Sequence, residues 1–209
     1  FNVNSKCIYN PLDAKNIIKK SKQKSKIYFK NKNTLKILNI GRFTDQKDQL
    51  TLIKSLNIIK STIKFEAIIV GRGILKANLK KYIDEYKLSK NIRIINFLNN
   101  PYPLIKQTEL FILSSKFEGL PNVLLESLAL KKFVISSNCR TGPNEILLNG
   151  KGGLLFKVGD YKELSKKIIY YSKNKKQCNK LLEYSINKLN RFDSQKNLKK
   201  YYDLVTSVK

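Results

Sequence analysis

Apolar runs alternate with segments of helical periodicity along most of the chain. The apolar runs are short, rich in Ile, Val, Leu and Phe, and bounded by turn residues, which is typical of strands in a buried parallel sheet. We expect strands at Lys36 to Ile40, Glu66 to Val70, Ile92 to Phe97, Leu110 to Ser114, Phe133 to Ser136 and Gly153 to Phe156. The pattern predicts helices at Gln49 to Lys60, Leu75 to Tyr86, Pro103 to Gln107, Asn122 to Leu130, Asn144 to Leu148, Tyr161 to Ser172, Lys175 to Asn190 and Ser194 to Thr206.

This alternation predicts repeated βα units. Right-handed connections wind such units into an α/β, Rossmann-like doubly wound parallel sheet with helices on both faces, here followed by a C-terminal helical tail. The 209 residues suffice for one full α/β domain. Ligands bind such sheets beyond the carboxyl ends of the strands, so we expect a functional site in the loops that follow the strands.

The strongly positive charge raises the possibility that the chain binds a polyanion. Lys and Arg total 42 against 15 Asp and Glu, a net charge of +27, which would attract a polyanion. Nearly all of this charge is lysine spread through predicted helices, which usually means solvated faces. The chain has no helix-turn-helix spacing, zinc finger or aromatic RNP pattern. A non-catalytic binding module for nucleic acid or anionic membrane is therefore an alternative.

The numbers and positions of cysteine and histidine argue against a metal site and against a disulfide-bonded protein. Cys7, Cys139 and Cys178 are far apart, and the chain has no histidine. A structural zinc site or a disulfide framework is therefore not expected. Phe1 opens the chain without a signal-peptide pattern, and no apolar run approaches the ~18 residues of a membrane span. We expect a cytoplasmic protein, with peripheral contact at the inner face of the membrane as a further expectation.

Two glutamates flank the turn between a predicted strand and a predicted helix. Glu118 and Glu126 lie eight positions apart in the run F-E-G-L-P-N-V-L-L-E, and Pro121 is expected at the first helical position. Free amides at a helix start, together with the helix dipole, form an anion site. Both carboxylates could then reach one elongated ligand, such as a nucleotide sugar. For isolated glutamates, a helix cap and a solvated charge would be the simpler interpretation.

Other loops after strands also carry unusual residues. The first loop holds Gly41, Arg42 and Lys47, and an arginine fork beside a lysine charge suits a diphosphate. Without a ligand, the simpler interpretation is that Gly41 forms a tight turn and that Arg42 and Lys47 are surface charges. The second loop, V-G-R-G, is weak evidence by itself. Two more loops follow later strands, N-F-L-N-N-P from Asn96 and S-S-N-C-R-T-G-P-N-E-I-L from Ser136.

Taken together, these segments resemble family GT4 ("glycosyl transferases group 1"), retaining glycosyltransferases of the GT-B fold. The run from Glu118 to Glu126 is close to the commonest form of that family's E-x7-E motif, and the first loop matches its G-R-x-x-x-Q-K element. The resemblance extends from Cys7 to the C-terminus, with specific matches between Asn39 and Asp160. Two positions depart from the family pattern: Arg72, where an acidic residue is common, and Asn99, where the F-x-G segment has glycine.

The resemblance implies roles for individual residues. Glu118 would position the donor sugar and Glu126 the ribose, while Arg42 and Lys47 would neutralise the donor diphosphate in place of a metal. The implied catalytic residues are Glu118, Arg42 and Lys47. The implied donor-binding residues are Gly41, Arg42, Lys47, Gly71, Phe97, Leu98, Glu118, Gly119, Leu120, Asn122, Val123 and Glu126. No metal and no cofactor are expected, and T-G-P-x-E-I-L (from Thr141) favours UDP-hexose or UDP-N-acetylhexosamine as donor substrate.

The resemblance also implies that the chain is the C-terminal, donor-binding half of a GT-B enzyme. Residues 1–15, with N-P-L-D, would be the interdomain linker, 16–190 the nucleotide-sugar domain, and 191–209 a crossover helix. A missing N-terminal domain would hold a glycan or lipid-linked acceptor for hexosyl transfer in surface polysaccharide or glycoconjugate synthesis. The isolated chain would then be inactive. An alternative is another GT-B nucleotide-sugar enzyme of the epimerase type.

Overall fold

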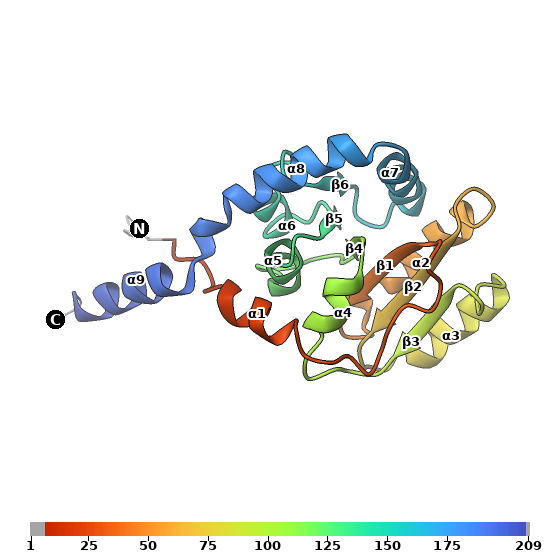
Figure 1. Ribbon diagram of the computed structural model, residues 1–209, viewed down its shortest axis with the longest axis horizontal. Coiled ribbons are helices and arrows are strands. Elements are labelled where there is room, and N and C mark those ends of the chain that lie inside the picture. The colour runs from red at the N-terminus through yellow and green to blue at the C-terminus, as the bar shows by residue number, and fades with distance from the viewer. Residues whose placement is uncertain (1–6, 208–209) are drawn as a thin grey trace.

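A six-stranded parallel sheet organises residues 7–207, the part of the chain that the computed structural model describes (Figure 1). Its strands follow the order β3-β2-β1-β4-β5-β6, and every neighbouring pair is parallel. They are β1 (Leu35–Ile40), β2 (Phe65–Val70), β3 (Ile92–Ile95), β4 (Leu110–Leu113), β5 (Phe133–Ser137) and β6 (Leu154–Phe156). The expected α/β doubly wound sheet is confirmed.

Helices cover both faces of the sheet because successive strand residues point to opposite sides. Ile37 packs into one hydrophobic core and its neighbour Leu38 into the other. The first core takes the apolar faces of α2 (Gln49–Ile59), α3 (Lys76–Glu85), α7 (Tyr161–Lys173) and, at Cys178, α8 (Lys175–Asn187). The second core takes those of α1 (Ala14–Lys20), α4 (Tyr102–Gln107), α5 (Asn122–Ala129) and α6 (Pro143–Ile146).

Several element boundaries differ from the sequence prediction. The predicted start of α5 at Asn122 is confirmed, but Pro121 is its N-cap, with extended backbone (φ −72°, ψ 102°), so the expectation that Pro121 is the first helical residue was wrong. β3 ends at Ile95, which leaves Phe97 in the following loop. The other predicted helix and strand ends coincide with the observed ends or differ from them by one to three residues, as expected for frayed termini. The sequence pattern had set no bounds for α1, a helix of seven residues.

The segment before α1 pairs with the segment before α9 (Ser194–Thr206) beside the sheet domain. Leu12 donates its N–H to the carbonyl of Phe192 at 2.6 Å, and the N–H of Ser194 bonds back to Leu12. The short 3₁₀ helix η2 (Leu189–Phe192) leads there into α9, which projects from the body (Figure 1). Parts of the expected linker (1–6) and crossover helix (208–209) lie outside the described residues.

The strand order has its switch point between β1 and β4. From β1 the chain continues to β2 and β3 on one side, whereas β4 continues to β5 and β6 on the other. The connecting segments therefore diverge above the neighbouring ends of β1 and β4. Doubly wound folds bind ligands at this switch point.

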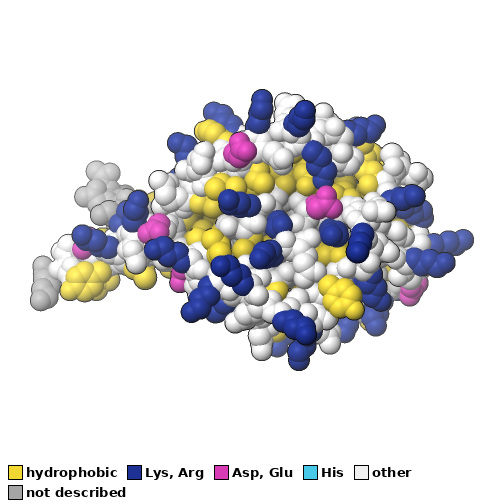
Figure 2. Space-filling model, viewed as in Figure 1, with side chains coloured by type: hydrophobic (Ala, Val, Ile, Leu, Met, Phe, Trp, Pro, Cys, Tyr) yellow, Lys and Arg dark blue, Asp and Glu magenta, His cyan; other side chains and the backbone are white. Residues whose placement is uncertain are grey.

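Positive side chains are scattered over the surface. Figure 2 shows Lys and Arg distributed across the visible face and around its rim, with few acidic side chains between them. This distribution agrees with the interpretation of the lysines as solvated helix faces. Within residues 7–207, no helix has the length and apolar character needed to cross a membrane.

Candidate active site

A cleft of about 690 Å³ opens at the carboxyl ends of β1, β2 and β3 and is closed on one side by the start of α5. Four separate loops contribute to its wall. Of the residues expected to bind a donor, the cleft is lined by Gly41, Arg42, Lys47, Gly71, Phe97, Leu98, Asn122, Val123 and Glu126. The strand order thus brings together side chains that are up to 85 positions apart in the sequence (from Gly41 to Glu126).

Lys47 connects this cleft to Glu118. Its Nζ lies 2.5 Å from Glu118 Oε1, and the Ser115 hydroxyl donates to the same carboxylate oxygen at 2.6 Å. The Glu118 side chain is only 7% exposed and that of Lys47 17%. A carboxylate this buried needs such partners, because an unpaired buried charge is strongly disfavoured. The pair therefore fixes both side chains at the edge of the cleft.

Hydrogen bonds join the loop after β1 to the loop after β4. The Ser114 hydroxyl donates to the carbonyl of Lys47 at 3.1 Å, and the N–H of Lys116 donates to the carbonyl of Gln46 at 2.8 Å. The Gln46 amide in turn donates to the carbonyl of Phe117 at 3.0 Å and accepts from Arg42 at 3.3 Å. The turn η1 (Asp45–Lys47) is thereby held against the E-G-L-P turn, which orients Arg42 and Lys47 as a unit.

Close backbone contacts explain two of the glycines. A Cβ at Gly71 would lie 1.9 Å from the carbonyl oxygen of Gly41, so no side chain fits where these two loops meet. Gly142 has φ +80°, and a Cβ there would lie 1.7 Å from the carbonyl oxygen of Gly119. Both conflicts are with backbone atoms, which cannot move aside as a side chain could. Glycine is therefore required at Gly71 in the cleft wall and at Gly142 against the E-G-L-P turn.

The start of α5 presents backbone amides to the cleft. Asn122 and Val123 are its first two residues, and both line the cavity. Within the described chain, no side chain caps this helix end. Uncapped N–H groups at a helix start, reinforced by the helix dipole, suit an anionic ligand.

Glu126 is held by a residue that the sequence analysis did not identify. The hydroxyl of Tyr102, from α4, donates to Glu126 Oε1 at 3.2 Å, and both side chains line the cleft. Burial raises the pKa of the Glu126 carboxyl, and the Tyr102 hydrogen bond partly counteracts this. Burial and the Glu126 charge raise the pKa of Tyr102 to about 12. The only sequence signal was its position directly after N-F-L-N-N-P, one of the loops that follow a predicted strand.

Three expected donor-binding residues do not line the cleft directly. Glu118 forms an ion pair with Lys47, and it is the Lys47 side chain that lines the cleft. Leu120 packs against the second core. Gly119 contacts Gly142 through its backbone, and Thr141 donates to the carbonyl of Glu118 at 2.6 Å, so these residues shape the turn. Arg72, whose role the sequence left open, lines the cleft with its guanidinium carbon 5.1 Å from the Phe97 ring centroid, a cation–π contact.

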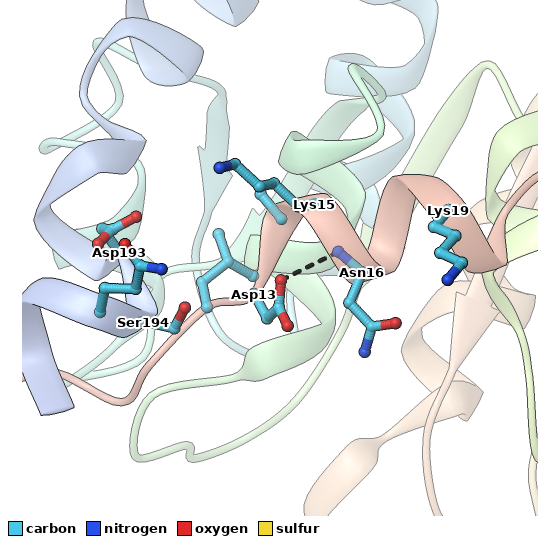
Figure 3. Close-up of a pocket in the computed structure, with 9 residues that line it drawn as sticks. Asp13, Lys15, Asn16, Lys19, Asp193 and Ser194 are labelled. Atoms are coloured by element: carbon cyan, nitrogen blue, oxygen red, sulfur yellow. Dashed lines mark hydrogen bonds between the residues drawn. The ribbon is translucent and has the colours of Figure 1, made fainter.

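A second hollow, of about 610 Å³, lies between the starts of α1 and α9 (Figure 3). Its acidic residues, Asp13 and Asp193, are helix caps: Asp13 accepts from the N–H of Asn16 at 3.0 Å, and Asp193 accepts from the N–H of Lys196 at 2.9 Å. Their carboxylates are thus already used in capping. Among residues 7–207 there is no group of three or more His, Cys, Asp or Glu side chains suited to a metal ion.

Comparison with known proteins agrees with this geometry. The family described as Glycosyl transferases group 1 matches residues 20–188. An uncharacterized glycosyltransferase of Methanocaldococcus jannaschii is 39% identical over 117 residues, which are 56% of this chain and 29% of that protein. The N-acetylgalactosamine-N,N'-diacetylbacillosaminyl-diphospho-undecaprenol 4-alpha-N-acetylgalactosaminyltransferase of Campylobacter jejuni is 35% identical over 151 residues, which are 72% of this chain and 40% of that protein. The chain therefore spans less than half the length of these two relatives.

Solved structures share the fold. HepE of Anabaena, in complex with UDP, superposes with a TM-score of 0.83 at 18% identity, over 97% of this chain and 57% of that chain. A glycosyltransferase of Rickettsia africae superposes with a TM-score of 0.76 at 24% identity, over 83% of this chain and 48% of that chain. The expected fold class is thus confirmed by structure comparison as well as by the strand order.

Proposed function

Because the chain belongs to the glycosyl transferases group 1 family, we propose that it is the donor-binding domain of a retaining GT4 glycosyltransferase. The donor is a nucleoside-diphosphate sugar, UDP-hexose or UDP-N-acetylhexosamine. One observation carries the proposal: Arg42, Lys47, Glu126 and the uncapped start of α5 share a single cleft. Two cations and helix-start amides suit a diphosphate, and a carboxylate beside them suits the hydroxyls of a ribose.

Each part of the donor has a place in this arrangement. The diphosphate lies between Arg42, Lys47 and the α5 amides, and the ribose hydroxyls bond to Glu126. The nucleobase lies toward Phe97 and Leu98, which line the cleft in the loop between β3 and α4. The transferred sugar extends toward Glu118, whose carboxylate is anchored to Lys47 at 2.5 Å.

Catalysis by this domain consists of stabilising the leaving group. As the bond from sugar to diphosphate breaks, negative charge develops on the diphosphate oxygens, and Arg42, Lys47 and the helix-start amides stabilise that charge. Within the described residues the cleft holds no histidine or free carboxylate suited to act as a general base, since Glu126 serves the ribose and Glu118 is ion-paired. The departing phosphate itself then takes the proton of the acceptor hydroxyl, and configuration at the anomeric carbon is retained.

The acceptor is a glycan or a lipid-linked sugar held by a further, N-terminal domain. The name of the Campylobacter relative describes transfer onto a diphospho-undecaprenol-linked sugar, which supports this class of acceptor. An exposed apolar stripe on α9 supports a packing partner, because its residues recur at helical spacing: Leu198, Tyr201, Tyr202 and Val205. Residues 1–15 would link that domain to this one, and residues 16–190 would bind the donor. Residues 191–209 would form a helix that packs against the N-terminal domain. The isolated chain would then bind donor without turnover, and its cytoplasmic location with peripheral membrane contact stays a prediction.

Calorimetric titration of the chain with UDP, together with its thermal unfolding in the presence of UDP, tests the proposal. We expect saturable binding and a rise in unfolding temperature with UDP concentration. A salt-sensitive gel shift with DNA or RNA, without any UDP-dependent thermal shift, would instead identify a non-catalytic basic module. Product analysis with the whole enzyme separates transfer from epimerisation, because only transfer yields a glycosylated acceptor.

A further inference from the structure

Tyr102 and Glu126 together separate two hollows. On one side is the donor cleft of about 690 Å³. On the other is a cavity of about 140 Å³ toward α1, which both side chains also line, together with Asp13, Asn16 and Leu125. Their hydrogen bond, 3.2 Å from the Tyr102 hydroxyl to Glu126 Oε1, therefore lies in the wall between the cleft and the cavity.

The Glu126 carboxylate has two directions available to it. In the cleft it faces the place proposed for the ribose. The small cavity offers the Asn16 amide and space for a water molecule, so a carboxylate turned that way could also be solvated. In the described part of the chain, Tyr102 is the residue whose side chain donates a hydrogen bond to Glu126. The Tyr102 hydroxyl thus fixes the position of Glu126 Oε1 in the wall between the cleft and the cavity.

We propose that Tyr102 is a positioning residue whose hydroxyl holds the Glu126 carboxylate in the cleft, ready to accept hydrogen bonds from the ribose hydroxyls. The inference rests on the proposed function and adds one residue to that site. Tyr102 is the first residue of α4, after β3, and Glu126 lies on α5, after β4, so the bond also links two walls of the cleft.

The ionisation of Glu126 depends on the same contact. Its neighbours with charge are Asp13 on the cavity side and Arg42, Lys47 and Arg72 on the cleft side. Burial raises the pKa of the Glu126 carboxyl, and the Tyr102 hydrogen bond lowers it. Replacing Tyr102 by Phe removes only the lowering contribution, so the Glu126 pKa rises further. Protonation, and the loss of an acceptor for the ribose hydroxyls, then begins at a higher pH.

Calorimetry with the chain tests this role. We expect Tyr102→Phe to weaken UDP binding about fivefold at neutral pH, the worth of one net hydrogen bond, and by a larger factor at mildly acidic pH. With 2',3'-dideoxy-UDP, which lacks both ribose hydroxyls, the variant and the unaltered chain should bind equally. In a Glu126→Gln background, Tyr102→Phe should add little further loss of UDP affinity. Tyr171→Phe is a matched control, because its hydroxyl donates to the carbonyl of Glu109 at 2.9 Å, at the amino end of β4.

The possible results separate this inference from the proposed function. Equal UDP affinity for Tyr102→Phe and the unaltered chain would overturn the role of Tyr102 and leave the donor site intact. Equal losses of affinity for UDP and for the dideoxy analogue would also overturn this role, since the effect of Tyr102 would then not depend on the ribose hydroxyls. Failure of the unaltered chain to bind UDP would overturn the proposed function and this inference with it.

Discussion

The ion pair between Lys47 and Glu118 yields the sharpest test of the site, because replacing Lys47 should affect both folding and ligand binding. In Lys47→Met the unbranched chain is kept to within one atom of its length and the charge is lost. Glu118, 7% exposed, keeps the Ser115 hydroxyl at 2.6 Å but loses its cation. Breaking a buried pair costs ~3–5 kcal/mol and an exposed pair at most ~1 kcal/mol. For this partly accessible pair we expect a loss of about 2 kcal/mol in the free energy of unfolding.

The assay is thermal unfolding followed by calorimetric titration with UDP. For a domain of this size, a loss of about 2 kcal/mol lowers the unfolding temperature by about 4–8 °C. Removing a charge-assisted contact with the diphosphate, worth about 1.5–3 kcal/mol, weakens UDP binding roughly 10- to 100-fold. The double variant Lys47→Met, Glu118→Gln removes both charges. We expect it to recover most of the unfolding temperature while UDP binding stays weak.

A neighbouring ion pair supplies the control. Lys116 and Asp45 join the same two loops at 2.6 Å, but their side chains are 43% and 82% exposed. Lys116→Met should therefore change the unfolding free energy by at most about 1 kcal/mol. If Lys47→Met bound UDP as tightly as the unaltered chain, the phosphate role of Lys47 would be refuted. An unchanged unfolding temperature would show that the pair contributes nothing to stability.

Three other predictions concern the same cleft. Glu126→Ala should weaken UDP binding by about tenfold, since two ribose hydroxyls lose their acceptor, while affinity for inorganic pyrophosphate stays unchanged; equal calorimetric affinity for UDP in variant and parent would remove the ribose role. Arg42→Ala should lower affinity for UDP far more than for uridine, and equal losses for the two ligands would contradict a diphosphate contact. EDTA should leave UDP binding intact if cations of the protein neutralise the diphosphate, and a large loss of affinity would indicate a bound metal ion.

The local chemistry of the site was predictable from contiguous segments. Gly41, Arg42 and Lys47 lie in one loop, and Glu118 and Glu126 in one turn and helix, so motif spacing sufficed to find them. Their partners were not predictable in this way. The Lys47–Glu118 pair joins residues 71 positions apart, and Tyr102 reaches Glu126 from a different helix. Nothing in the run N-N-P-Y-P marks that tyrosine as a hydrogen-bond donor to the site.

Some details of the backbone were likewise predictable from the sequence and others were not. Periodicity located every strand of the sheet to within two residues at each end, because buried parallel strands are continuous apolar runs. It gave the start of α5 at Asn122 but counted Pro121 as helical, since the backbone conformation of Pro121 depends on how the turn packs against Gly142 and its neighbours. The need for glycine at Gly71 likewise became clear only once the carbonyl of Gly41 was found against it.

Sequence by itself determined the βα alternation, the family and the candidate charges, because strand and helix periods and motif spacings are properties of neighbouring residues. Only the tertiary structure decided which loops share a cleft. The order β3-β2-β1-β4-β5-β6 sets β1 beside β4 although more than sixty residues separate them in the chain. Parallel pairing then places the carboxyl ends of these strands side by side, and it is this adjacency that turns separate cations, carboxylates and a tyrosine into one site.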